Sequence, residues 1–210
     1  VLGTSLNLIM TIAAGYPLSK RDFRGRGGIT FLFTLTMFFS GGMVPNFLLI
    51  KNLDMYNSIW ALLLPGCVSA WNLVIMRTYF QTSIPEEICE SAYIDGCSNI
   101  STLLRIVLPL SMPIIAVMVI FYGVGHWNSY FSALLYLKDR DKYPLSLVLR
   151  EILLQGMGQE KSGAEVVDSV ADLLLFETLK YAVIIVSSVP MLTLYPALQR
   201  YFVKGTMVGS

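Results

Sequence analysis

Five stretches of this sequence contain no aspartate, glutamate, lysine or arginine over a length close to that of a membrane-spanning helix. They cover residues 1–19, 27–50, 55–76, 106–137 and 181–199. A helix needs about 20 mostly apolar residues to cross the hydrocarbon core of a bilayer. One such stretch also occurs in signal sequences and in buried helices. Five within 210 residues leave too little polar sequence for a soluble globule, so the sequence predicts an all-α, polytopic membrane bundle.

The composition supports this fold class and excludes several functions. Hydrophobic residues make up 55% of the chain and charged residues 14%, compared with about 25% charged residues in soluble domains. The net charge of +1 gives no electrostatic basis for binding nucleic acid. The three cysteines have no metal-binding spacing, and His126 is the single histidine. We therefore expect no metal site and no cofactor.

The basic residues predict which loops face the cytoplasm. Four of them lie in the short first loop: Lys20, Arg21, Arg24 and Arg26. Because positive charge is enriched in cytoplasmic loops, this loop is expected inside. Alternation then places 51–57 and 138–172 outside, and 77–105 and the tail from residue 200 inside. Val1 would lie outside and is not a methionine. We expect an N-terminally truncated chain with five spans visible of six.

The cytoplasmic segment 83–109 has the signals of an ordered helical hairpin. Ser83 and Glu86 have the spacing of a capping box, which predicts a helix start. Gly96 is placed to end that helix in the left-handed region, and Ser98 is placed to cap a second short helix. A helix, a glycine turn and a helix are more than a connection between spans requires. Such a segment is suited to docking into a groove on a cytoplasmic partner.

The same segment resembles the EAA loop of ABC importer permeases. That loop has the pattern E-A-A, three residues, G, nine residues, I-x-L-P, and every interval matches here, with serine for the first alanine. The strings WNSYFSALLYL at 127–137 and RYFVKG at 200–205 extend the resemblance to the MalG-type carbohydrate permease family, and to its LplC-like branch in particular. The likeness covers nearly the whole chain.

The resemblance implies a single permease domain over 1–210, in which the EAA helix contacts an ATPase subunit. The expected coupling residues are Glu90, Ser91, Ala92, Gly96, Ile106, Leu108 and Pro109. An alternative for Glu90 is that it only caps its own loop. The implied partners are a cytoplasmic ABC ATPase dimer, a second and different permease subunit, an extracellular solute-binding lipoprotein and the lipid membrane. The family also implies that 138–172 contacts the binding protein and that the tail 201–210 reaches the ATPase.

The expected function is carbohydrate import, most simply of an oligosaccharide. The candidate residues of the translocation path are Asn72, Trp127, Asn128 and Tyr130. Polar groups within spans tend to face the bundle interior, but aromatic residues near an interface also act as membrane anchors. The sequence has no G-x-x-x-x-G-K segment, so ATP hydrolysis is assigned to another chain. Import of amino acids, peptides or an ion stays open as an alternative cargo, whereas a catalytic triad using His126 and a non-transporting scaffold have little support.

Overall fold

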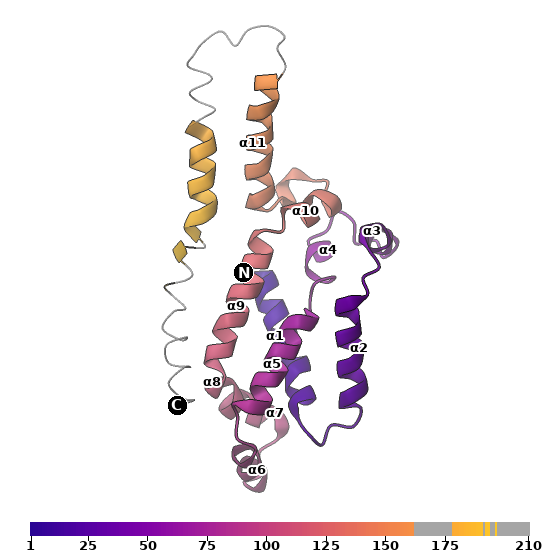
Figure 1. The fold of residues 1–210 in the computed structure, drawn as a ribbon, viewed down its shortest axis with the longest axis vertical. Helices are drawn as coiled ribbons and strands as arrows, with labels where there is room; N and C mark the ends of the chain where they lie inside the picture. Colours follow the sequence, from indigo (N-terminus) through magenta and orange to yellow (C-terminus); the bar gives the residue numbers. More distant parts are fainter. Residues whose placement is uncertain (162–177, 191, 194–195, 197–210) are drawn as a thin grey trace.

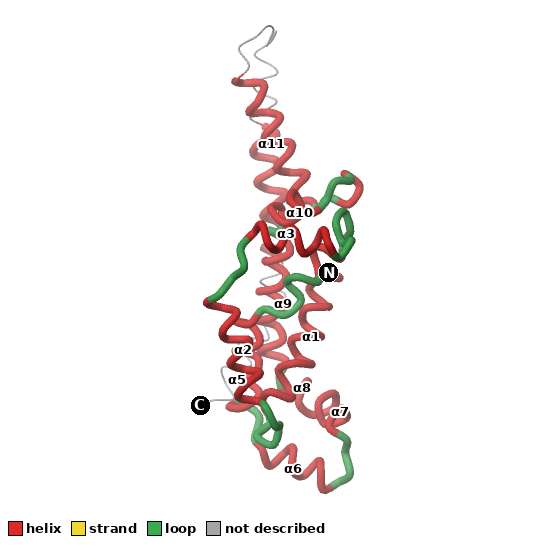
Figure 2. The backbone as a smooth tube through the Cα atoms, turned by 90° about the vertical axis from the view of Figure 1, so that its right-hand side faces the viewer, coloured by secondary structure: helices red, strands yellow, loops and turns green. Residues whose placement is uncertain are grey.

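The structure is a computed structural model that describes residues 1–161, 178–190, 192, 193 and 196. Those residues form helices and connections without a strand, as the all-α prediction requires (Figure 1, Figure 2). The first helices are α1 (Leu2–Ser19), α2 (Arg26–Phe38), α3 (Met43–Asn52), α4 (Trp60–Leu63), α5 (Ala70–Thr82) and α6 (Glu86–Ile94). They are followed by α7 (Asn99–Thr102), the π-helical turn η1 (Leu103–Val107), α8 (Leu108–Leu110), α9 (Met112–Trp127), α10 (Tyr130–Tyr136), the 3-10 turn η2 (Arg140–Lys142) and α11 (Leu145–Lys161). A further helix covers Thr178–Pro190.

The centre of the bundle is formed by α1, α5 and α9, which pack side by side (Figure 1). Buried side chains of these helices form one apolar cluster together with Ile84, from the connection after α5, and Val107, from η1. The members from the three helices are Tyr16, Met76, Phe80, Ile114, Met118 and Tyr122. Gly3 lets α1 approach α9 closely, because a Cβ there would lie 2.6 Å from His126 Nε2. Small residues at helix contacts are common in membrane bundles. Lipid is as apolar as the side chains, so helices there associate through close van der Waals packing and not through the hydrophobic effect.

Polar side chains of α1 hold the non-helical segment between α4 and α5. Asn7 is 2% exposed. Its Nδ2 donates to the carbonyl oxygens of Gly66 and Cys67, and its Oδ1 accepts from His126 Nε2 at 2.7 Å. Unpaired backbone groups are costly where water is excluded. Asn7 therefore allows α4 and α5 to be separated by irregular backbone within the bundle.

The spans expected at 27–50, 55–76 and 106–137 are each interrupted. No single described helix is both long and apolar enough to cross a bilayer, whereas two bent pairs of helices reach the required length and composition when each pair is taken together. One pair is α2 with α3, bent by 117°, and the other joins Asn99–Leu110 to α9, bent by 83°. Gly42 has φ of 87° at the first break, and Pro113 begins α9 after the second. The number of spans stays a prediction.

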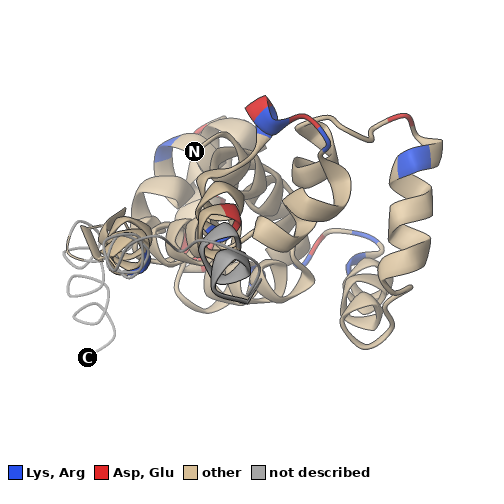
Figure 3. Ribbon diagram, turned by 90° about the horizontal axis from the view of Figure 1, so that it is seen from above, with Lys and Arg blue, Asp and Glu red and all other residues tan. Residues whose placement is uncertain are grey.

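The α1–α2 loop and α6 lie at the lower end of Figure 1, α3 lies near mid-height, and α10 and α11 lie above it. Which of these connections face the cytoplasm stays a prediction. Viewed along the long axis, most of the ribbon carries no charged residue (Figure 3). The segment 138–172, expected as a loop, contains η2 and all of α11. Its residues 162–172 and the tail 201–210 lie outside the described residues.

Candidate coupling site

The predicted capping box at the start of α6 is wrong. The N-cap of α6 is Pro85, without a side-chain cap. Ser83 instead ends α5, where its N–H donates to the carbonyl oxygen of Tyr79 at 2.9 Å. The reason lies in the neighbouring Ile84, which is only 8% exposed and belongs to the apolar cluster of the bundle. Burial of Ile84 fixes the connection, and Glu86 in the first turn still suits the positive end of the helix dipole.

The predicted end of α6 at Gly96 is confirmed. Gly96 has φ of 79°, and its N–H donates to Tyr93 O at 3.0 Å. The N–H of Cys97 donates to Ala92 O at 2.9 Å. These two bonds make a complete Schellman motif, which satisfies carbonyls at the helix end. A Cβ in this left-handed conformation costs about 1–2 kcal/mol, so glycine is the residue that suits this turn.

The predicted second helix is also confirmed. The N–H of Ser101 donates to Ser98 Oγ at 3.3 Å, which caps α7. The chain continues without a break through η1 and α8, and α9 follows the bend at Ser111. Within this run Ile106 and Leu108 are half-buried and Pro109 is exposed. Val107, at 1% exposed, anchors the run in the bundle core.

The helix α6 has one buried and one exposed side. Ala92 is 5% exposed and faces the protein. Glu90 and Ser91 are exposed, and Ser91 Oγ donates to the carbonyl oxygen of Glu87 at 2.8 Å. Within the described part of the chain, the carboxylate of Glu90 has no hydrogen bond and no ion pair. Ile88, four residues after Ile84 and four before Ala92, is exposed.

The free end of this segment is strongly apolar. Tyr93 is 75% exposed, Ile94 is 84% exposed, and Ile100 beyond the glycine turn is 71% exposed. Tyr93 and Ile94 are the last residues of α6, and Ile100 lies in α7, which follows the turn. Exposed apolar side chains that cluster on one element mark an interaction surface more often than scattered ones do. The segment therefore presents a carboxylate and an apolar tip around a fixed turn.

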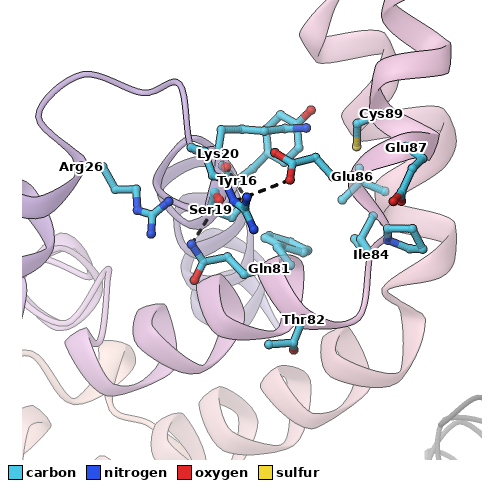
Figure 4. A pocket seen from close by; sticks show the side chains of 14 residues that line it. Tyr16, Ser19, Lys20, Arg26, Gln81, Thr82, Ile84, Glu86, Glu87 and Cys89 are labelled. Atoms are coloured by element: carbon cyan, nitrogen blue, oxygen red, sulfur yellow. Dashed lines mark hydrogen bonds and ion pairs between the residues drawn. The ribbon is translucent and has the colours of Figure 1, made fainter.

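A polar cavity of about 490 Å³ lies between the base of α6 and the ends of α1 and α5 (Figure 4). Arg21 and Glu86 both line it, and Arg21 Nε lies 3.6 Å from Glu86 Oε2. Both side chains are largely exposed, and such pairs contribute about 0–1 kcal/mol. At the inner wall, Lys20 Nζ lies 5.2 Å from the centre of the Tyr16 ring. The first loop is thus in contact with the start of α6.

Two side chains of α5 tie the end of α1 to this site. Arg77 Nε donates to Leu18 O at 3.0 Å, and Gln81 Nε2 donates to Ser19 O at 3.2 Å. Both satisfy carbonyls that the end of a helix leaves without partners. Burial, and secondarily the nearby Arg26, lower the pKa of Arg77. The last turn of α1, the first loop and α5 are therefore joined at the base of α6.

The four candidate path residues each have a contact within the chain. Asn72 is buried in the first turn of α5. Trp127 Nε1 donates to the carbonyl oxygen of Ser187 at 3.0 Å, and Asn128 Nδ2 donates to Val124 O at 3.0 Å. The guanidinium carbon of Arg150 lies 5.1 Å from the centre of the Tyr130 ring. Their role in a translocation path stays a prediction.

Sequence reasoning missed the buried polar pairs of the bundle. Asn7 and Thr11 are one helical turn apart in the first charge-free window, and both are buried against α9 or its neighbours. Two polar residues at that spacing share one helix face. Within an otherwise apolar stretch, this spacing was the available signal that α1 has a side facing protein.

Three comparisons place this geometry among known proteins. The family model described as "Binding-protein-dependent transport system inner membrane component" matches residues 7–208. The chain is 42% identical over its full length to the polygalacturonan/rhamnogalacturonan transport system permease protein YtcP of Bacillus subtilis (strain 168), covering 72% of that protein. It is also 42% identical over its full length to the protein LplC of Bacillus subtilis (strain 168), covering 70% of it.

A solved structure agrees with these relatives. A chain from the crystal structure of a bacterial ABC transporter involved in the import of the acidic polysaccharide alginate superposes with a TM-score of 0.82 at 31% identity. The match covers 95% of this chain and 70% of that one. The resemblance predicted from the spacing of residues 90–109 is thereby confirmed, as is the prediction of a multi-pass protein of the cell membrane. The chain belongs to the family of binding-protein-dependent transport system inner membrane components.

Proposed function

We propose that this chain is a permease subunit that imports a carbohydrate, and that segment 83–109 connects it to an ATPase subunit. The observation that supports this proposal is the turn at Gly96, whose Schellman geometry ends α6 and separates it from α7. The family membership implies an ATPase and a solute-binding protein as partners. The names of the relatives, which concern polygalacturonan, rhamnogalacturonan and alginate, support a polymer-derived sugar as cargo.

The packing of α6 suits a rigid coupling element. Its inner side is held by Ile84 and Ala92, which are both buried. Its outer end presents Tyr93 and Ile94 to solvent. A short helix with such an apolar tip fits a groove on a partner by the helix-in-groove mode. Glu90 adds a carboxylate for a charge-assisted hydrogen bond to that partner.

A movement of α6 has a direct route into the bundle. From Gly96 the chain continues through α7, η1 and α8 to α9, and Val107 anchors this run in the core. A second route leads from Arg21 and Lys20 into α1. Rigid elements with tightly packed contacts transmit displacements because packed cores resist compression. Docking at α6 would therefore move α9 and α1 together.

The complete transporter in this proposal has more than one membrane chain. We propose a heterodimer with a second permease subunit, because a translocation path must be enclosed on all sides. The extracellular binding protein would dock at the opposite end of the molecule, on segment 138–172. Asn72, Trp127, Asn128 and Tyr130 are the proposed contacts of the path.

The test is reconstitution of the complex with the second permease, ATPase and binding protein encoded beside this chain's gene. ATP-driven uptake is then measured for Gly96→Val and for Gly27→Val as the matched control. Gly27 lies in α2, and a Cβ there meets nothing within 4 Å. We expect Gly96→Val to abolish uptake at normal assembly in the membrane, and Gly27→Val to keep it. Normal uptake by Gly96→Val would remove the coupling role.

The cargo is tested separately on the binding protein. Fragments of polygalacturonan, rhamnogalacturonan and alginate are compared with amino acids and peptides by calorimetry. We expect binding only of the carbohydrate fragments. A binding protein that takes amino acids or peptides alone would contradict the carbohydrate assignment and leave the importer assignment intact.

A further inference from the structure

One asparagine fastens together two connections that lie far apart in the sequence. Asn57 lies between α3 and α4, and its Oδ1 accepts from the backbone N–H groups of Lys138 and Asp139, each at 3.0 Å. Its Nδ2 donates to Asp139 Oδ2 at 2.8 Å. The amide of this single side chain thus makes three hydrogen bonds to the connection that follows α10.

The backbone of Asn57 is engaged as well. Its N–H donates to Tyr136 O at 2.8 Å, and its carbonyl oxygen accepts from Lys142 Nζ at 2.8 Å. Lys142 Nζ also donates to Asp139 Oδ2 at 2.9 Å. Asn57 has φ of 61°, a left-handed conformation that asparagine adopts more readily than most residues. We call Asn57, Asp139 and Lys142 the Asn57 clasp.

The clasp fixes the point from which α11 starts. Leu137, next to the clasped residues, is 3% exposed and packs with Ala133 and Leu147 in a small apolar cluster. Leu147 belongs to the first turn of α11. Further along, Arg140 Nε lies 3.7 Å from Glu151 Oε2, which joins η2 to the side of α11. Beyond this base, α11 extends from the end of the molecule opposite to α6 (Figure 1).

We propose that the Asn57 clasp positions α11 for docking of the extracellular binding protein. This inference rests on the proposed function, in which segment 138–172 contacts that protein. An interface element that is held in its bound orientation before docking avoids the entropic cost of being ordered on docking. The clasp lies on exposed connections, whereas the bundle is held by the separate cluster around Met76 and Met118. Loss of the clasp therefore loosens α11 without unfolding the bundle.

Three substitutions separate the contributions of Asn57. Asn57→Gly keeps the left-handed backbone and removes the three side-chain bonds. Asn57→Ala removes the same bonds and also disfavours the conformation. Asn57→Asp keeps an acceptor for the two N–H groups but brings a carboxylate against Asp139. Combining Asn57→Asp with Asp139→Asn exchanges the two groups, so that an amide again faces a carboxylate. Lys142 Nζ keeps its bond to the backbone carbonyl oxygen of residue 57 but loses its carboxylate acceptor at position 139.

The experiment measures ATP hydrolysis by the reconstituted complex as the concentration of sugar-loaded binding protein is raised. For Asn57→Ala we expect the half-maximal concentration to rise about tenfold, because several hydrogen bonds that order the docking element are lost. The rates without binding protein and at saturation stay at the wild-type values. The exchanged pair lowers the half-maximal concentration relative to Asn57→Asp alone, because the amide and carboxylate face each other again. Asn52→Ala, at the last residue of α3 and outside the clasp, serves as the control and leaves the half-maximal concentration unchanged.

The outcomes distinguish the inference from the proposed function. If the wild-type complex is not stimulated by the binding protein, the proposed function fails. If the wild type is stimulated and Asn57→Ala shows the same half-maximal concentration, the inference is overturned and the function stands. If all three Asn57 variants fail to assemble, the clasp is needed for folding instead of docking, which also overturns the inference. A raised half-maximal concentration without recovery in the exchanged pair would equally contradict it.

Discussion

The hydroxyl groups of Thr11 and Tyr122 lie 2.6 Å apart in the interior of the bundle, and they join α1 to α9. Thr11 is fully buried and Tyr122 is 6% exposed. The N–H of Ser69, at the start of α5, also points to the Tyr122 hydroxyl at 3.4 Å. One phenol therefore serves groups from all three central helices. Because water is excluded there, each of these groups depends on the others for a partner.

Removing the phenol hydroxyl is expected to loosen the three-helix contact. Tyr122→Phe keeps the ring and leaves Thr11 without its bond, which we expect to lower the free energy of unfolding by about 1 kcal/mol, since hydrogen bonds between membrane helices contribute about 0.6–2 kcal/mol. The measurement is thermal unfolding of the purified complex in detergent. Thr11→Val removes the other partner. If the two losses add fully in the double variant, the hydroxyls do not interact as described.

The exposed tip of α6 is expected to affect partner binding but not stability. Ile94 is 84% exposed, so Ile94→Asp buries no charge in the free subunit and should change its unfolding temperature little. If the ATPase groove covers this side chain, the same change places a carboxylate in an apolar contact and should abolish co-purification of the ATPase. Phe23→Asp in the neighbouring loop is the matched control and should retain the ATPase. If both variants co-purify the ATPase equally well, Ile94 is not part of the docking surface.

The sequence predicted the helix ends of this segment where local chemistry determines them. Gly96 and Ser98 act through their own backbone or side chain, so their roles follow from residue type and spacing alone. Ser83 has an equally suitable residue type, but the burial of Ile84 beside it decides where α5 ends and α6 begins. That burial depends on Tyr16 and Val107, which come from distant parts of the chain.

The same distinction explains the spans and the Asn57 clasp. A charge-free window shows only that charged residues are absent. It cannot reveal the 117° bend between α2 and α3 near Gly42, because the sequence is apolar both before and after the bend. The residues around Asn57 do not indicate its hydrogen bonds, because its partners Lys138 and Asp139 lie more than eighty residues away in the sequence. Contacts between distant connections depend on the packing of the helices that separate them. The turn at Gly96 and the cap at Ser98 were therefore predictable from a local pattern, whereas the contacts of Asn57 with the segment before α11 required the fold.

Trp127 offers a test of whether a candidate path residue instead has a structural role. Its Nε1 donates to Ser187 O at 3.0 Å and so joins the end of α9 to the helix Thr178–Pro190. Trp127→Phe keeps an aromatic face but removes the donor. We expect a loss of stability of about 1 kcal/mol with an unchanged Michaelis constant for sugar uptake. Asn128→Ala, which removes a bond within the same turn, is the comparison. A raised Michaelis constant with unchanged stability would instead place Trp127 in the path.

The pH dependence of the Asn57 clasp follows from the ionisation of Asp139. Hydrogen bonds from Lys142 and then Asn57 hold the pKa of Asp139 below its usual range. A carboxyl group whose folded pKa is depressed contributes stability that is fully present above the unfolded pKa, near 4, and is lost as the pH falls through the lower folded value.

We therefore expect the backbone N–H groups of Lys138 and Asp139 to stay protected from hydrogen exchange at all pH values down to about 4 and to lose protection below it. The measurement is exchange of the peptide covering 136–143, with rates corrected for the intrinsic effect of pH. Asp139→Asn has no ionisable group at this position, so its protection should be lower at neutral pH and should show no step in acid. A step of the same size in Asp139→Asn would assign the titration to another group.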